Sequence, residues 1–172
     1  MTNQNQAQQT MAQINHLLTQ DGNADLEKQW LEQQAEAQPE LLDAIRQLTT
    51  QDFRVIAEID RAQEIHIKAL PALTALSQPT ISRIITRFTT ATLLEKYQKP
   101  DNKKDFLVRL TPLGQQVADL HRHLDQQLLT QVANILDAFP DDEVTHFNQM
   151  LTKIGQIQPE LYGYQTKRVV HR

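Results

Sequence analysis

The sequence predicts a mainly α-helical fold that contains one small β-hairpin. Within residues 77–114, a polar helix start with arginines leads into an apolar strand, a polar and basic turn, a returning strand and a helix opened by Thr-Pro. Outside this segment, apolar residues recur every three or four positions, which is the spacing of a helix that buries one face. The order helix, hairpin, helix is that of a winged helix-turn-helix, in which the hairpin forms the wing.

Residues 1–23 form a polar arm that is rich in Gln and Asn and ends in the turn signal Asp21-Gly22-Asn23. Four apolar residues at helical spacing favour a short helix in this arm, with a disordered tail as the alternative: Met11, Ile14, Leu17 and Leu18. Residues 24–48 then read as helical, and a second helix starts at Pro39, a residue favoured in the first helical turn.

Residues 49–111 contain the winged helix-turn-helix. Thr49 or Thr50 is expected to cap its first helix, whose apolar stripe has the spacing of a buried face: Phe53, Ile56, Ala57 and Ile59. A shorter helix at residues 67–76 should direct three leucines inward: Leu70, Leu73 and Leu76. Ser77 caps the next helix, which has Pro79 in its first turn and an apolar inward face: Ile81, Ile84 or Ile85, and Phe88.

Two short strands follow, at residues 93–99 and 106–110, and a turn-rich stretch at residues 100–105 separates them. Thr111-Pro112 opens a helix of about 27 residues, which would be about 40 Å long. A helix of that length extends beyond the small winged core, so we expect it to pack on a second chain. A last helix begins after Pro140, and residues 112–172 are assigned to C-terminal dimerisation helices and a tail.

The composition limits the classes of function. The chain has 172 residues and no cysteine, which excludes disulfides, thiol nucleophiles and cysteine-ligated zinc. No apolar run approaches the roughly 20 residues of a membrane span, and the polar N-terminus lacks the pattern of a secretion signal. We therefore expect a cytoplasmic protein without a membrane partner.

The charge is unevenly distributed. Residues 66–109 hold eight basic and three acidic residues, a net charge of +5, so the remainder of this −4 chain carries −9. A basic block in an acidic protein is typical of a surface that binds phosphate groups. The alternative is a chance cluster on a solvated face, but its overlap with the winged pattern favours double-stranded DNA.

The helix capped by Ser77 has the side chains of a groove-reading helix. Its first turns lack bulky apolar groups on one face and supply donors and acceptors, with residues expected to bind DNA at Ser77, Gln78, Pro79, Thr80, Ser82, Arg83 and Arg87. Lys103 and Lys104 lie at the hairpin tip, where a flexible cation reaches a minor groove or a phosphate. The alternatives are an ordinary amphipathic helix and an edge hairpin that carries Lys for solubility.

These residues resemble a known family. The ordered set Ser77-Gln-Pro-Thr80-Ile-Ser82-Arg83, Leu93-Leu94-Glu-Lys, Asp101-Asn-Lys103 and Leu110-Thr111-Pro-Leu-Gly114 is similar to the MarR (multiple-antibiotic-resistance regulator) family. The resemblance covers about residues 25–155. It implies a homodimer, joined by its terminal helices including residues 24–48, that binds a pseudo-palindromic operator, usually as a repressor.

The chain departs from the family pattern at two positions. Thr92 stands where the family usually has Gly before the first wing strand, and Lys103 replaces the Arg of the family's Asp-x-Arg wing motif. Lysine keeps the charge but loses the planar fork, so minor-groove insertion should be weaker or less selective. In the family the wing Asp orients a nearby arginine, so the resemblance implies that Asp101 pairs with Arg83.

The resemblance also implies a small-molecule effector, because many members respond to anionic or phenolic compounds. Candidate lining residues are Trp30, Phe53 and Leu120, and plain core packing is the alternative. Two histidines spaced two apart, His121 and His123, lie on different helix faces and offer poor chelation geometry. We expect no metal, no cofactor and no catalysis, since the chain lacks the motifs of phosphate loops, nucleophile elbows and metalloproteases.

Two other functions stay open: a winged-helix module that binds an acidic protein partner, and a metal-responsive regulator with the same fold.

Overall fold

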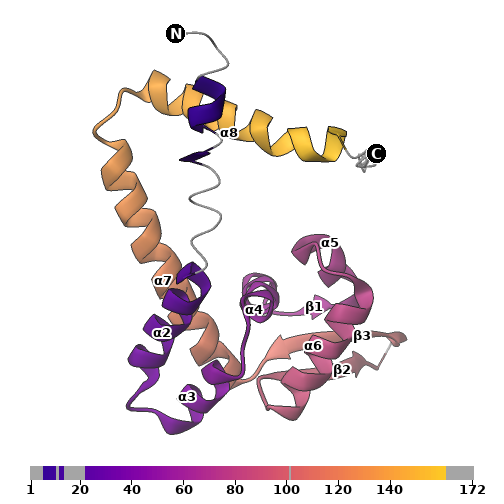
Figure 1. The fold of residues 1–172 in the computed structure, drawn as a ribbon. Helices are drawn as coiled ribbons and strands as arrows, with labels where there is room; N and C mark the ends of the chain where they lie inside the picture. Colours follow the sequence, from indigo (N-terminus) through magenta and orange to yellow (C-terminus); the bar gives the residue numbers. More distant parts are fainter. Residues whose placement is uncertain (1–5, 11, 14–21, 101, 162–172) are drawn as a thin grey trace. The chain divides into compact units, whose positions relative to one another are not determined.

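The computed structural model describes residues 6–10, 12–13, 22–100 and 102–161. The chain divides into two compact units, Met1–Leu124 and Asp125–Arg172, which are described separately (Figure 1). The apolar residues predicted to form an arm helix, from Met11 to Leu18, lie outside the described residues. In the part of the chain that is described, no helix has the length and apolar character needed to cross a membrane.

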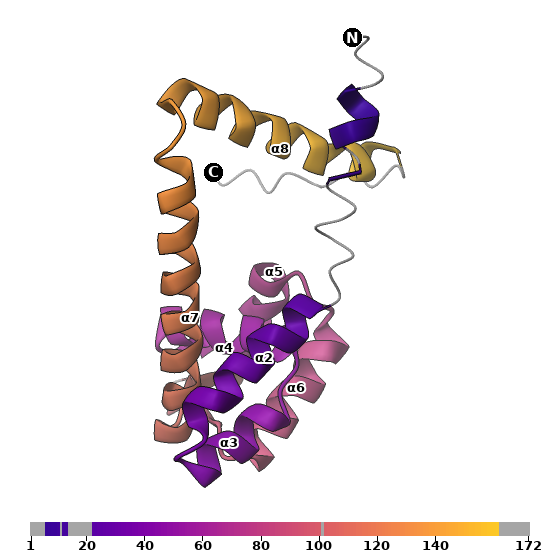
Figure 2. The same cartoon turned by 60° about the vertical axis from the view of Figure 1, so that its left-hand side comes forward.

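The first unit begins with three helices: α2 (Gly22–Ala35), α3 (Pro39–Arg46) and α4 (Thr50–Ala62). Pro39 is in the first turn of α3, as predicted, and Thr49 is the N-cap of α4. Apolar side chains at helical spacing face the core from α3 and α4: Leu41, Ala44, Ile45, Phe53, Val55, Ile56 and Ile59. The turned view shows α2 passing beside the first turns of α7 (Figure 2), where Glu27 pairs with His121 at 3.1 Å.

The first helix of the helix-turn-helix is shorter than the sequence predicts. Residues 67–76 were expected to form one helix, but a 3₁₀ turn η1 (Ile67–Ala69) precedes a five-residue α5 (Leu70–Thr74). The expected inward position of Leu73 is wrong, because Leu73 is 53% exposed. Leu70 and Thr74 occupy the inward face, and the buried Thr74 hydroxyl donates to the Leu70 carbonyl at 2.7 Å.

The wing is the outer part of a three-stranded antiparallel sheet of order β1-β3-β2. Its hairpin joins β2 (Leu94–Lys99) to β3 (Asn102–Leu110), with Leu94 opposite Leu110 and Lys99 opposite Asn102. The prediction of a turn at residues 100–105 was therefore too long, because β3 already begins at Asn102. β1 (Ile65–His66) was not predicted, since two residues carry no periodicity.

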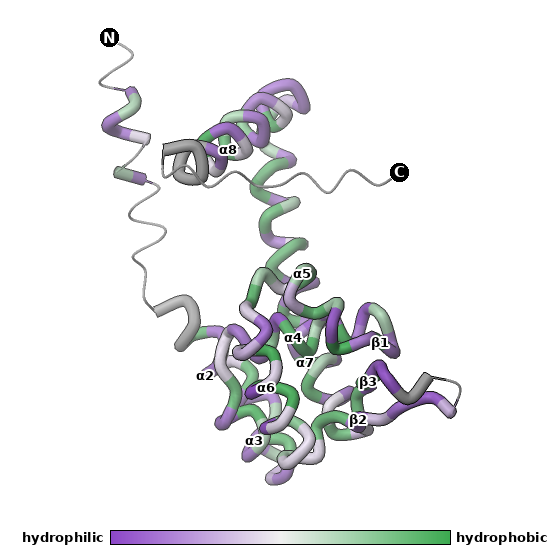
Figure 3. Tube along the Cα trace, turned by 90° about the vertical axis from the view of Figure 1, so that its right-hand side faces the viewer, coloured by the Kyte–Doolittle hydropathy of each residue, from purple (hydrophilic) through white to green (hydrophobic). Residues whose placement is uncertain are grey.

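A single apolar core joins the elements of the first unit. Its largest fully buried side chains include one from each of seven elements, α2 to α6, β3 and α7: Leu31, Ile45, Ile56, Leu70, Phe88, Val108 and Val117. Figure 3 shows apolar stretches along α6 and α7 and polar residues toward the tip of the hairpin. The helix α7 (Pro112–Leu136) starts in this core, and Gln115 ties it to α4 by donating to Asp60 at 2.7 Å.

The C-terminal end of the recognition helix α6 (Gln78–Thr90) connects directly to the wing. The Leu93 amide donates to the Phe88 carbonyl and the Thr92 amide to the Thr89 carbonyl, which is the hydrogen-bond pattern of a Schellman motif. Thr92 therefore adopts a left-handed conformation with φ of 56°, at the position where the family resemblance places glycine. A β-branched residue is strained there.

The start of α7 is fixed to the same junction. The Thr111 hydroxyl donates to the Thr92 carbonyl at 2.6 Å, and the Thr111 amide donates to the Leu93 carbonyl at 3.1 Å. A Cβ atom on Gly114 would lie 1.9 Å from the Leu93 carbonyl oxygen, so only glycine fits this approach. The end of α6, the wing and the start of α7 therefore share one rigid connection.

The second unit contains the last turns of α7 and the helix α8 (Asp141–Leu161). α7 ends at Leu136 and has 25 residues, close to the predicted length of about 27. Many of the large apolar side chains in this unit are exposed, with 45% to 69% of their surface accessible: Leu128, Leu129, Val132, Ile135, Phe139, Phe147, Met150 and Leu151. Such an apolar surface is typical of an interface with another chain.

We predict that Thr92→Gly stabilises the protein by about 1 kcal/mol, because glycine adopts the left-handed conformation without a Cβ penalty. Urea unfolding monitored by circular dichroism measures the change. Thr92→Ala is the control: it removes the hydroxyl but keeps the Cβ, so it should recover little of the gain. Equal stabilisation by both variants would show that the hydroxyl, and not the backbone conformation, is unfavourable.

Candidate nucleic-acid interface

The recognition helix α6 is capped as the sequence predicts. The Ser77 Oγ accepts a hydrogen bond from the Thr80 amide at 3.3 Å, and Pro79 occupies the first turn. The buried face consists of Ile81, Ile84, Ile85 and Phe88, so both candidate isoleucines point inward. Among the predicted DNA-binding residues of this helix, Thr80 is half-buried. The others are exposed on the opposite face: Ser77, Gln78, Pro79, Ser82, Arg83 and Arg87.

The two arginines of α6 have different surroundings. Arg83 is exposed and forms no ion pair with any residue that the structure describes. Arg87 is 46% exposed, and its guanidinium pairs with the Asp52 carboxylate at the start of α4. Asp52 itself is fully buried. The Arg87 side chain is therefore anchored, whereas that of Arg83 is available to a ligand.

Asp52 was not predicted from the sequence as part of the site. Its Oδ2 accepts hydrogen bonds from the Thr49 amide and the Thr49 hydroxyl, both at 2.8 Å, while its Oδ1 accepts one from Arg87. The pattern Thr49-x-x-Asp52 is a capping-box signal that indicates the bond to Thr49. The bond to Arg87, 35 residues away, has no such local signal.

A hollow of about 320 Å³ lies between the start of α4 and the exposed face of α6. Its lining brings together three predicted DNA-binding residues and three residues of the α4 start: Thr80, Arg83 and Arg87 with Thr49, Gln51 and Asp52, over Ile84. The side chains can supply two guanidinium groups, the Thr80 hydroxyl and the Gln51 amide. Such donors are suited to a phosphate oxygen.

The wing is described only in part. Asp101 and the side chain of Lys103 lie outside the described residues, so the pairing of Asp101 with Arg83 stays a prediction. Lys104 belongs to β3 and is exposed. Four cations of residues 66–109 are paired with carboxylates: Lys68 with Asp105, Arg87 with Asp52, Lys99 with Glu64 and Arg109 with Glu95. Asp52 and Glu64 lie outside this segment, so they reduce its effective charge below the +5 of its composition.

Glu64 connects the end of α4 to the first wing strand. Its carboxylate accepts hydrogen bonds from the Lys99 ammonium, at 2.5 Å, and from the Tyr97 hydroxyl. These bonds, that of Lys99 before that of Tyr97, lower the pKa of Glu64 below its ordinary value near 4.5. The same contact with Glu64 raises the pKa of Tyr97. An ionised Glu64 therefore links the end of α4 to two residues of β2.

Two of the predicted effector residues, Trp30 and Phe53, contact the stretch of α7 that contains the third, Leu120. Phe53 is buried and stacks on the His121 ring at a centroid distance of 5.2 Å, and the half-buried Trp30 lies 5.9 Å from the His123 ring. Leu120 packs against the core. Among the described residues, no group of three His, Asp or Glu side chains is placed to hold a metal ion.

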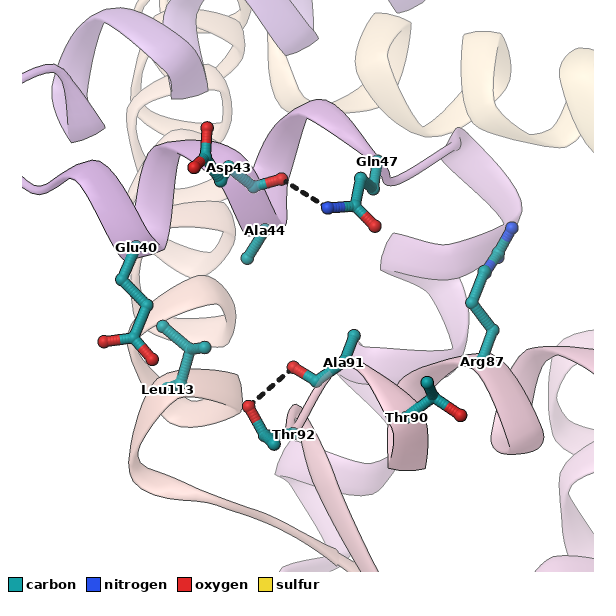
Figure 4. A pocket seen from close by; sticks show the side chains of 9 residues that line it. All are labelled: Glu40, Asp43, Ala44, Gln47, Arg87, Thr90, Ala91, Thr92 and Leu113. Carbon is teal, nitrogen blue, oxygen red and sulfur yellow. Dashed lines mark hydrogen bonds between the residues drawn. The ribbon is translucent and has the colours of Figure 1, made fainter.

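A separate cleft of about 520 Å³ lies at the C-terminal end of α6, and none of the three predicted effector residues lines it (Figure 4). Its lining comes from α3, the end of α6 and the first turn of α7: Glu40, Asp43, Ala44, Gln47, Arg87, Thr90, Ala91, Thr92 and Leu113. The Arg87 side chain extends away from Thr92 and Leu113, toward α4 (Figure 4).

Comparison with known proteins agrees with this geometry. Residues 48–106, which span α4 to the wing, match the MarR family model. These residues form a MarR-family domain. The chain is 26% identical over 121 residues to YhjH, an uncharacterized HTH-type transcriptional regulator of Bacillus subtilis (strain 168). This match covers 68% of this chain and 69% of YhjH. The chain is also 26% identical over 140 residues to the HTH-type transcriptional regulator PchR of the same organism, covering 80% of each.

Solved structures show the same fold. The adhesin competence repressor AdcR from Streptococcus pyogenes matches with a TM-score of 0.64 and 16% identity, over 88% of this chain and 96% of AdcR. A mutant of E. coli MarR in complex with operator DNA matches with a TM-score of 0.57 and 21% identity, over 84% of this chain and 93% of MarR. The winged helix-turn-helix predicted from the sequence is thus confirmed.

We predict that Glu64→Gln lowers the melting temperature at pH 7 and that the difference disappears at acidic pH. Because the folded-state pKa of Glu64 is depressed, its contribution is present above pH 4.5 and is lost as the pH falls through the lower folded value. Thermal unfolding of both proteins from pH 7 to pH 3 tests this. As a control, Tyr97→Phe should move the pKa of Glu64, measured by NMR, back toward 4.5; an unchanged pKa would contradict the assignment.

Proposed function

We propose that this MarR-family protein is a sequence-specific DNA-binding transcriptional regulator, which acts as a repressor. The observation that supports this most directly is the exposed polar face of α6, capped by Ser77 and carrying Arg83 without a carboxylate partner among the described residues. In the proposal Gln78, Ser82 and Arg83 contact base edges in the major groove, and Lys103 and Lys104 contact the backbone or the minor groove. This role would place the protein in the cytoplasm, as the sequence predicts.

The proposal includes a homodimer on a pseudo-palindromic operator. Its support is the exposed apolar surface of the second unit, where α7 and α8 leave side chains such as Val132, Ile135 and Phe147 accessible. A cavity of about 420 Å³ between these helices is lined almost entirely by apolar residues. A second copy of the chain that covers this surface would pair two recognition helices.

Release of the DNA by a small-molecule effector is a further part of the proposal. The stretch of α7 that contacts Trp30 and Phe53, and that includes Leu120, is the candidate site. A change in packing there would reach α4 through Phe53.

Arg83→Ala tests the recognition helix. We expect it to weaken binding to a selected operator by about 1–3 kcal/mol, because a bidentate contact to a base is lost, and to weaken binding to random duplex much less. Fluorescence anisotropy with both DNAs measures the ratio. Arg83→Lys keeps the charge without the fork, so it should lose selectivity and retain non-specific binding. Wild-type selectivity in either variant would refute the role of Arg83.

Lys104→Ala tests the wing. We expect a similar loss of affinity for all DNA sequences and a salt slope reduced by about 1, since the lysine is assigned to a phosphate. Anisotropy titrations at several salt concentrations measure the slope, and Lys104→Arg, which keeps the charge, should bind as the wild type does. A loss confined to the selected operator would contradict a phosphate contact. If the wild-type protein shows no salt-dependent binding, a module for an acidic protein partner becomes the better explanation.

Val132→Glu tests the dimer. Placing a carboxylate within the exposed apolar surface should dissociate the dimer, because the charge would be buried without a partner. Sedimentation equilibrium measures the molecular mass. Thr130→Glu, two residues earlier and so on another face of α7, is the matched control and should leave the dimer intact. A Val132→Glu protein that remains dimeric would place the interface elsewhere.

A further inference from the structure

We propose that Asp52 is a positioning residue for DNA binding: it holds the Arg87 guanidinium at the rim of the hollow between α4 and α6, where Arg87 binds one backbone phosphate. The inference rests on the proposed DNA-binding function and adds to it the ligand of this hollow and the role of a buried acid. Arg87 becomes a phosphate contact in place of a base reader.

The Asp52 carboxylate holds the Arg87 side chain in place. It is fully buried, and both oxygens are used: Oδ2 by the amide and hydroxyl of Thr49, Oδ1 by Arg87. A buried carboxylate is stable only when its charge and its lone pairs are compensated. Thr49, the N-cap of α4, fixes the orientation of the Asp52 carboxylate. Asp52 in turn sets the direction of the Arg87 side chain.

Anchoring leaves Arg87 able to bind a second anion. A guanidinium has five N–H donors, and the described contact with Asp52 uses one of its terminal nitrogens. The side chain is still 46% exposed. A free arginine loses much side-chain freedom when it binds a phosphate, whereas an arginine that is already held loses less. Asp52 therefore lowers the entropic cost of the contact.

The hollow beside Arg87 fits a single phosphate. Arg83 lies in its lining without a carboxylate partner in the described part of the chain, and the hydroxyls of Thr49 and Thr80 and the amide of Gln51 line the rest. Two arginines against one carboxylate give a net charge of +1, which matches one backbone phosphate. The hollow lies between the start of α4 and the exposed face of α6, where the DNA backbone that flanks a groove-bound helix passes.

The direction in which Asp52→Asn changes the affinity for DNA distinguishes a positioning role from simple electrostatics. Asp52→Asn removes a negative charge near DNA, so electrostatics alone predicts tighter binding. Asn can still accept the bonds of Thr49, but it no longer holds Arg87 by charge. Positioning predicts weaker binding, together with the loss of one phosphate contact.

A double-mutant cycle tests the proposal. The full-length wild type, Asp52→Asn, Arg87→Gln and the double variant are titrated against a labelled random-sequence duplex at several salt concentrations. We expect each single variant to bind roughly threefold to tenfold more weakly, with a salt slope lower by about 1, and the double variant to match the single variants. Asp43→Asn is the charge-matched control on α3, and it should bind as tightly as the wild type or slightly more tightly.

Either of two results overturns the proposal: Asp52→Asn binds at least as tightly as the wild type, or its loss persists undiminished when Arg87 is already glutamine. If Asp52→Asn does not fold by circular dichroism, Arg87→Gln replaces it; a wild-type salt slope and affinity in that variant overturns the proposal as well. A wild-type protein with no salt-dependent DNA binding refutes the proposed function itself, whereas normal wild-type binding with an inert Asp52 refutes only this inference.

Discussion

The arrangement of α4 and α6 depends on one ion pair, between the fully buried Asp52 at the start of α4 and the half-exposed Arg87 in the third turn of α6. Loss of Arg87 would leave the buried carboxylate without its charged partner, which is unfavourable. The pair joins two elements that are 35 residues apart in sequence. It therefore sets the position of the recognition helix relative to the helix before it, while the apolar face of α6 supplies most of the burial energy.

The other end of α6 is fixed by backbone contacts. Thr92 takes a left-handed conformation, its carbonyl accepts from Thr111, and Gly114 lies directly against the Leu93 carbonyl. The end of α6, the wing and the start of α7 thus meet within a few residues, which gives a physical route by which a change along α7 reaches the exposed face of α6. The strained Thr92 lies at the centre of this junction, at the wall of the cleft in Figure 4.

Much of the fold could be predicted from the sequence, because its signals are local: the Ser77 cap, Pro79 and Pro39 in first helical turns, and the apolar spacing of α6. Features set by distant contacts could not. Leu73 faces outward because Thr74 takes the inward position, and β1 exists only through its pairing with β3. Within the candidate site, the exposed residues of α6 follow from helical periodicity, whereas the partner of Arg87 requires the three-dimensional structure.

In the proposed function, two copies of this chain read DNA through paired α6 helices. Selection of bound sequences from a random duplex library, with the full-length protein, tests it most directly. We expect an inverted repeat whose half-sites are about one helical turn, roughly 10 base pairs, apart. Recovery of unenriched DNA, or of a single half-site without symmetry, would contradict the claim.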